Sequence, residues 1–247
     1  REFVPLIGGM ILFCYYTYKV SFFDYDFFLF SFLILLLGIF SDNNILQSPR
    51  LRLILQTLVL LFFMYLSDLQ VSDLRSEFLN NFISNYYIGL FFTTFCLLTL
   101  INGSNFIDGL DGLNLGYFFL IITIIFYLNN SQLIKANEQQ IISIFHVVSF
   151  LLILNIFNYL YLGDSGSYLI GFIFGIFLID LSNNNYSLSP YFVTLLLWYP
   201  AFENLFSIIR KRIIKDDPFK PDNNHFHQLL FNYLKKNNNN LIKKFSN

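Results

Sequence analysis

Eight long apolar runs occupy most of this 247-residue chain and constrain its fold more than any other feature. Each run is close to, or somewhat shorter than, the roughly 20 residues that an α-helix needs to cross the hydrocarbon core of a bilayer. Only 13% of the residues are charged, which is too few to cover the surface of a soluble domain. The runs cover residues 4–18, 27–40, 51–66, 86–101, 113–128, 141–162, 168–181 and 190–209. We therefore expect an all-α polytopic membrane protein with about eight transmembrane helices.

The basic residues are divided unequally between the two sides of the membrane that these spans define. With a cytoplasmic N-terminus, 12 of the 15 Lys and Arg residues fall inside, and only Lys19, Arg75 and Lys135 fall outside. The positive-inside rule favours this orientation. The net charge of -1 gives no support for nucleic-acid binding.

No repeat, linker or change of composition divides the chain. We therefore interpret residues 1–247 as a single membrane-embedded domain, in which 210–247 form a cytoplasmic histidine-containing loop and a basic tail. Cys14 and Cys96 lie in apolar runs without metal-ligand spacing, so both are interpreted as small apolar side chains.

The most unusual polar segment, NGSNFIDGLDGL at 102–113, lies between two apolar runs. Asn102, Asn105, Asp108 and Asp111 recur at every third position, and residues three apart are neighbours on a helix. Charged side chains at such places are costly and commonly functional. A capped helix end is the alternative, but a cap needs one such side chain rather than four. The pattern predicts converging oxygen ligands.

A second segment, at 163–167, places Asp164 between glycines at the start of a predicted span. Backbone amides and small side chains can approach a phosphate at such a position. Mg2+ typically takes one or two carboxylates together with substrate phosphate oxygens. Asp164 is therefore a candidate metal ligand, with a simple helix N-cap as the alternative.

Two further polar segments fall on the same predicted side. Asp42 ends one apolar run, and Arg50 and Arg52 begin the next, where anchoring to headgroups would also explain the arginines. The loop at 210–228 contains Asp222 and the pair His225 and His227, side chains suited to a diphosphate or a sugar. Lipid headgroups and zinc are alternative ligands for this loop. Four polar segments on one side suggest one site at the cytoplasmic face.

Taken together, these segments resemble the polyprenyl-phosphate N-acetylhexosamine-1-phosphate transferases, the family that includes the phospho-N-acetylmuramoyl-pentapeptide transferase. The motifs occur in family order across essentially the whole chain. They are Pro5-x-x-Gly8-Gly9, Asp42 with Ser48-Pro49 and Arg52-Leu53, Asn102-x-x-Asn105-x-x-Asp108-Gly-x-Asp111-Gly-Leu113, Gly163-Asp164-x-Gly166-Ser167, and Pro221-Asp222-x-x-His225-x-His227.

The resemblance implies a Mg2+-dependent phosphotransferase of the EC 2.7.8 type, with Mn2+ as an alternative metal. A polyprenyl phosphate would attack a UDP-N-acetylhexosamine and release UMP, as the first membrane step of envelope polysaccharide or cell-wall synthesis. Asp164 would bind the metal, Asp108 and Asp111 would arrange metal and diphosphate, and Asp42 would help to deprotonate or position the lipid phosphate. The implied substrate-binding residues are Asn102, Asn105, Arg52, Asp222, His225 and His227.

The resemblance also implies a multi-pass protein of the bacterial inner membrane and a homodimer. The sugar cannot be read from these motifs, although the shortened histidine loop favours the envelope-polysaccharide branch. The family has a span before Pro5 and at least one after the basic tail, so we expect this chain to be truncated at both ends.

Two alternatives stay open. Where the family usually has two adjacent acids, this chain has Ser41 before Asp42, so a catalytically degenerate member is one alternative. A transporter or lipid-binding protein is the other, because broken helices with Asp and Asn also form transporter sites. The position of the polar clusters at span ends, without an inverted repeat, favours the transferase.

Overall fold

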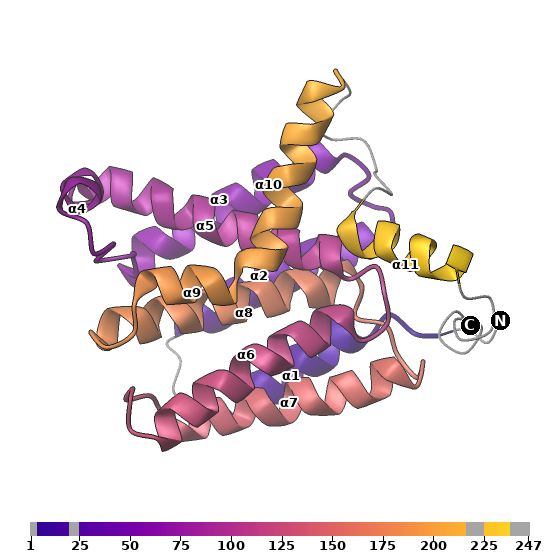
Figure 1. The fold of residues 1–247 in the computed structure, drawn as a ribbon, viewed down its shortest axis with the longest axis horizontal. Helices are drawn as coiled ribbons and strands as arrows, with labels where there is room; N and C mark the ends of the chain where they lie inside the picture. Colours follow the sequence, from indigo (N-terminus) through magenta and orange to yellow (C-terminus); the bar gives the residue numbers. More distant parts are fainter. Residues whose placement is uncertain (1–3, 20–24, 216–224, 238–247) are drawn as a thin grey trace.

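The computed structural model describes residues 4–19, 25–215 and 225–237, and all regular structure within these ranges is helical. Figure 1 shows most of the long helices lying side by side, with α10 crossing them. The helices are α1 (Gly8–Lys19), α2 (Tyr25–Asp42), α3 (Pro49–Ser67), α4 (Glu77–Ile83), α5 (Tyr86–Ile107), α6 (Leu113–Asn130), α7 (Glu138–Ile156), α8 (Gly163–Asn184), α9 (Pro190–Leu196), α10 (Trp198–Ile213) and α11 (Phe226–Asn237).

The structure confirms a polytopic all-α protein but not the expected count of eight spans. Six helices of the described residues, α2, α3, α5, α6, α7 and α8, are long and apolar enough to cross a membrane. A seventh span arises if the bent pair α9 and α10 counts as one. The run at 4–18 contains only the 12-residue helix α1, which is shorter than a bilayer core requires.

The run at 190–209 is not the single straight helix that its apolar composition suggested. The axes of α9 and α10 differ by 73°, and the helical structure is interrupted at Leu197. Pro200 lies in the first turn of α10 and explains the break. Its ring would clash with the carbonyl group of Leu196 in a continuous helix, whereas proline is tolerated in a first turn.

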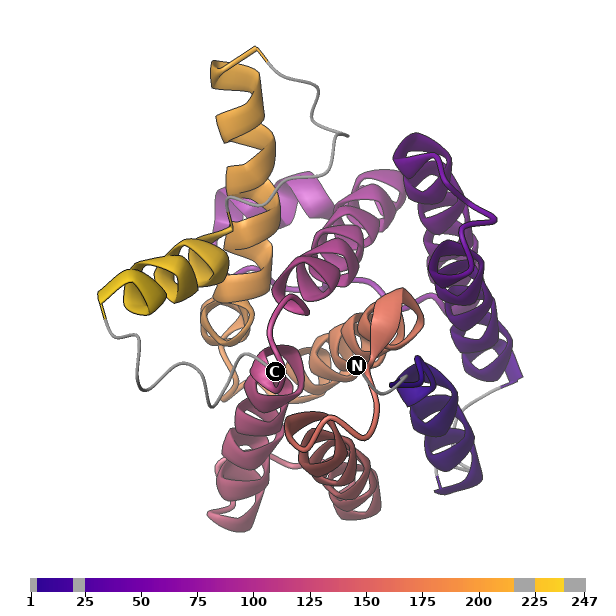
Figure 2. The same ribbon diagram turned by 90° about the vertical axis from the view of Figure 1, so that its right-hand side faces the viewer.

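Helix α8 is the centre of the molecule. Its side chains are buried along almost its whole length, and α1, α2 and α5 pack directly against it. In the end-on view of Figure 2, α8 lies in the middle with the other helices around it. Because a bilayer gives little hydrophobic drive for association between helices, close packing of small residues has to hold such a core together.

Glycines allow the closest of these contacts, at the end where α8 begins. A Cβ atom on Gly38 of α2 would lie 2.2 Å from the Cα atom of Ser165, and one on Gly9 of α1 would lie 2.6 Å from the nitrogen of Gly166. The segment before α1 joins the same contact, because the Tyr161 N–H donates to the carbonyl oxygen of Pro5 at 3.0 Å. The Pro5-to-Gly9 motif therefore packs against the start of α8.

The predicted polar segments meet at one end of the bundle. The connections at 43–48, 108–112 and 157–162 all lie on the right-hand side of Figure 1. The start of α8 and the start of α11 lie at this same end. The expectation that the segments containing Asp42, Asp108 and Asp164 share one side of the protein is thus confirmed.

Candidate active site

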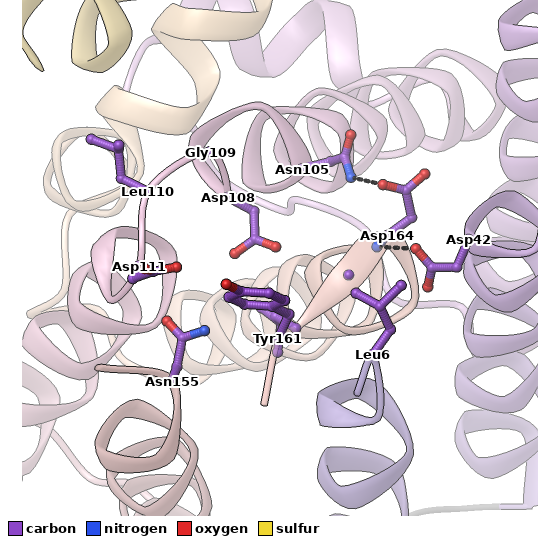
Figure 3. Close-up of a pocket in the computed structure, with 12 residues that line it drawn as sticks. Leu6, Asp42, Asn105, Asp108, Gly109, Leu110, Asp111, Asn155, Tyr161 and Asp164 are labelled. Carbon is purple, nitrogen blue, oxygen red and sulfur yellow. Dashed lines mark hydrogen bonds between the residues drawn. The ribbon is translucent and has the colours of Figure 1, made fainter. Parts of the chain in front are cut away.

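A cavity of about 500 Å³ opens at this end of the bundle, and Figure 3 shows the side chains around it. Five of the predicted site residues are among those that line it: Asp42, Asn105, Asp108, Asp111 and Asp164. The remaining lining residues are Leu6, Gly109, Leu110, Asn155, Tyr161, Leu162 and Gly163. Because its polar atoms are mainly carboxylate and amide oxygens, the cavity suits a hard cation and a phosphate ligand.

Asp42 caps the first turn of α8 from another helix. Its two carboxylate oxygens accept hydrogen bonds from the backbone N–H groups of Asp164, at 2.8 Å, and Ser165, at 3.1 Å. Helix α8 receives no hydrogen bond from the side chain of its own N-cap residue, Leu162. A carboxylate at a helix N-terminus is favoured by the exposed N–H groups and by the helix dipole. Asp42 therefore holds Asp164 in place, which sequence reasoning did not foresee.

Asp164 is surrounded by three hydrogen-bond donors. One of its oxygens accepts from the side-chain amide of Asn105 at 2.6 Å, and the other from Arg52 at 3.0 Å. Ser41 donates to that second oxygen and accepts from Arg52, so its hydroxyl group lies between the two charged side chains. Arg52, predicted as a substrate contact, is thus ion-paired with the predicted metal ligand.

The segment at 102–113 changes structure in its middle. Helix α5 ends at Ile107, Asp108 is its C-cap, and Gly112 with a φ of 77° precedes α6. Asp108 and Asp111 consequently lie in the turn between two helices rather than on one helix face. Burial, with the nearby carboxylates of Asp164 and Asp42, raises the pKa of Asp108 well above its usual value. Such a shift is typical of functional carboxylates.

Of the predicted substrate residues that the structure describes, only Asn105 lines the cavity, whereas Arg52, Asn102, His225 and His227 do not. The side-chain amide of Asn102 donates to the side-chain oxygen of Gln56 at 3.0 Å and to the carbonyl oxygen of Leu98 at 2.9 Å, so it joins α5 to α3. Asp222 lies outside the described residues. The substrate roles of both stay predictions.

His225 and His227 lie beside the turn between α5 and α6. The Nε2 atom of His227 packs so closely on Gly109 that a Cβ atom there would lie 2.7 Å away. The two imidazole rings are nearly parallel, with centroids 5.8 Å apart. Burial lowers the pKa of His227, against the opposing effect of the Glu203 carboxylate. The structure therefore brings the histidine segment next to the aspartate segment, as expected.

Sequence reasoning missed Asn155, at the end of α7, which lines the cavity and is buried. Its side-chain oxygen accepts from the Gly112 N–H at 2.6 Å, and its amide donates to the carbonyl oxygen of Leu160 at 3.1 Å. One side chain thus ties the turn containing Asp108 to the connection before α8. A polar residue within the apolar run at 141–162 was the only signal in the sequence.

Replacing Asn155 by Ala is expected to destabilise the fold by about 1–3 kcal/mol, because one buried and one partly buried backbone group lose their partners. Both cavity-lining connections are then free to move, so turnover falls as well. Thermal unfolding in detergent measures the first effect. Asn184→Ala is the control, because it breaks one exposed hydrogen bond to Asp180 at the far end of α8. Equal unfolding midpoints for the two variants would contradict this account of Asn155.

The side chains that could bind a metal ion fit Mg2+ only if a substrate supplies further ligands. No group of three or more His, Cys, Asp or Glu side chains in the described part of the chain is arranged to hold an ion alone. Asp164 and its neighbours nevertheless offer hard oxygen atoms beside an open cavity. Mg2+ commonly keeps one or two protein carboxylates and takes phosphate oxygens and water as its other ligands.

The fold and the cavity together define a multi-pass membrane protein with a phosphate-compatible site at one end of its helices. Residues 26–182 match the family described as Glycosyl transferase family 4, and the chain belongs to this family. It is 28% identical to the undecaprenyl-phosphate alpha-N-acetylglucosaminyl 1-phosphate transferase of Thermotoga maritima, over 92% of this chain and 67% of that protein. The protein of the same name from Escherichia coli K12 is 26% identical, over 92% of this chain and 65% of the relative. The chain thus spans about two thirds of the length of these relatives.

Proposed function

We propose that this protein transfers N-acetylhexosamine-1-phosphate from a UDP-sugar to undecaprenyl phosphate or a similar polyprenyl phosphate and releases UMP. The names of the two relatives given above state that they act on undecaprenyl phosphate. The observation that carries the proposal is the position of Asp164. It lies at the start of the central helix, faces the cavity and is held by Asp42, Asn105 and Arg52.

The balance of charge at the cavity supports a bound cation as part of this proposal. Asp42, Asp108, Asp111 and Asp164 line the cavity, and Arg52 is ion-paired with Asp164. A diphosphate would be repelled by this surplus of carboxylates. A bound Mg2+ would neutralise the diphosphate, with Asp164 as its protein ligand and Asp108 and Asp111 beside it.

In the proposed reaction an anionic oxygen of the lipid phosphate attacks the β-phosphorus of the UDP-sugar. The bond from the β-phosphorus to the bridging oxygen breaks, and UMP leaves with that oxygen. This transfer depends on position and charge rather than on a covalent intermediate. Asp42 acts by holding the start of α8, and Ser41 cannot act as a carboxylate base. Arg52 supplies positive charge near Asp164 for the phosphates.

The donor sugar nucleotide, the metal, a homodimer and a site facing the cytoplasm of a bacterial inner membrane are parts of the same proposal. The uneven distribution of Lys and Arg supports this orientation. A membrane face is also where a water-soluble nucleotide-sugar can meet the phosphate of a lipid. The connections that contain site residues lie at the end of the helices, as this meeting requires.

The test is release of UMP from UDP-N-acetylhexosamines by membranes that contain the protein, with and without undecaprenyl phosphate, Mg2+ and a chelator. Release is expected only when lipid and metal are both present. If a related enzyme works in the same membranes and this protein does not, the proposal fails and the catalytically degenerate alternative stands. Release without added or endogenous lipid would indicate hydrolysis rather than transfer.

A further inference from the structure

Glu203 is a buried carboxylate that belongs to none of the motifs in the sequence. It lies on α10 and is 2% exposed. One of its oxygens accepts from the backbone N–H of Phe226 at 2.9 Å, and the other lies 3.0 Å from Nδ1 of His225. Because an unpaired buried carboxylate is costly, these contacts tie the start of α11 to α10. Glu203 therefore places the histidine segment.

The two contacts also decide which nitrogen of His225 carries hydrogen. A backbone N–H can only donate, and an ionised carboxylate can only accept. Phe226 donates to one oxygen of Glu203, and Nδ1 of His225 lies 3.0 Å from the other oxygen, so beside an ionised carboxylate this Nδ1 must carry a hydrogen. The tautomer of a histidine is commonly set by the hydrogen bond of its other nitrogen in this way.

Glu203 and His225 lie against the end of the helix bundle that contains the cavity. The ring of Phe106, just before the end of α5, packs on the His225 ring with centroids 4.9 Å apart. Nδ1 of His227 is 3.9 Å from Glu203 and 3.4 Å from the hydroxyl group of Tyr199. Its Nε2 atom is buried against Gly109 and has no hydrogen-bond partner within the described part of the chain. An unsatisfied buried nitrogen at this point suits a polar ligand.

We propose that Glu203 is a positioning residue for the nucleotide-sugar: it fixes the Nδ1–H form of His225 and holds both imidazoles beside the Asp108–Asp111 turn. This inference rests on the proposed function for its ligand. The carboxylate acts through the histidines and does not touch the substrate. The shape of the histidine segment thus depends on a residue of the broken helix pair, 22 residues earlier in the chain.

Glu203→Gln is the decisive variant, because an amide has only one oxygen. If that oxygen accepts from Phe226, the amide NH2 faces His225, whose Nδ1 must then accept and whose hydrogen moves to Nε2. We expect the 15N resonances of histidine-labelled protein, at a pH of about 8 where histidine is ordinarily neutral, to show this change of tautomer. The KM for UDP-N-acetylglucosamine should rise about tenfold, the equivalent of one hydrogen bond to a charged group, with a smaller change in kcat.

Two variants serve as comparisons. Glu203→Asp keeps two acceptor oxygens and should keep the Nδ1–H form, whereas Glu138→Gln makes the same change at an exposed site in the first turn of α7 and should alter nothing. His225→Gln assigns the resonances. Wild-type protein with hydrogen only on Nε2 of His225 would overturn the proposal without any variant. So would a folded Glu203→Gln protein with the wild-type tautomer and KM.

The two proposals fail in different ways. Wild-type protein that releases no UMP under any condition would remove the transferase function, while the resonances of His225 would still test its contact with Glu203. Normal turnover together with an Nε2–H tautomer would leave the transferase intact and remove the positioning role. A Glu203→Gln variant that does not fold leaves the decision to the wild-type tautomer and to Glu203→Asp.

Discussion

Asp164→Asn is expected to lower the rate of UMP release by roughly a thousandfold or more, because several kcal/mol of charge stabilisation by a bound metal would be lost. The substitution changes no volume, so the protein should remain folded and inserted. An amide can still accept from Ser41 and Arg52 through one oxygen, but it binds a divalent cation poorly. Turnover of purified variant and wild type across a range of Mg2+ concentrations measures the effect.

The matched control is Asp180→Asn, which makes the same change in the same helix, at the end remote from the cavity. Asp180 is exposed and accepts from Asn184 one turn later. This variant should keep wild-type turnover and the same dependence on Mg2+. Full Mg2+-dependent activity of Asp164→Asn would remove Asp164 from the metal site. Equal losses in both variants would show that the effect is structural.

Gly38→Ala is expected to have a large effect on stability. The added Cβ atom would lie 2.2 Å from the Cα atom of Ser165 and 2.5 Å from its nitrogen, so the clash is with backbone that no side-chain rotation can relieve. Helices α2 and α8 would have to separate, at a cost of about 3 kcal/mol or more. Asp42, one turn after Gly38, would move away from the start of α8, so activity should fall with stability.

Gly116→Ala provides the comparison with the same substitution in another membrane helix. A Cβ atom on Gly116 of α6 meets only a side-chain carbon of Leu152, at 3.9 Å, which is an ordinary contact. This variant should be as stable as the wild type or more stable by roughly 0.5–1 kcal/mol, since alanine favours helix over glycine. Thermal unfolding of both variants in the same detergent decides the matter. An unchanged midpoint for Gly38→Ala would contradict the close packing of α2 on α8.

Much of the fold followed from apolar run lengths. Runs near the length of a bilayer crossing became α2, α3, α5, α6, α7 and α8. The count of eight was not confirmed within the described residues, because α1 is short and Pro200 follows the break between α9 and α10. Hydropathy registers composition along a run, whereas the break depends on the clash of one proline ring with one carbonyl group.

The sequence predicted which residues form the candidate site better than it predicted the contacts between them. Asp42, Asp108, Asp111 and Asp164 do share a cavity, as motif order and sidedness indicated. The sequence contained no sign that Asp42 would cap α8, or that Arg52 would pair directly with Asp164 while Ser41 contacts both side chains. Asn155 and Glu203 lay outside the motifs, and only their burial and hydrogen bonds reveal what they do.

The sequence by itself determined that this chain is a bundle of membrane helices with the polar residues of its motifs at one end. Long apolar segments in a bilayer must satisfy their backbone groups internally, and helices do so within one segment. Only the tertiary structure decided which polar groups meet. Asp42 and the Asp164 amide it caps are 122 residues apart. Such a contact arises from close helix packing at Gly9 and Gly38, and no local pattern can specify it.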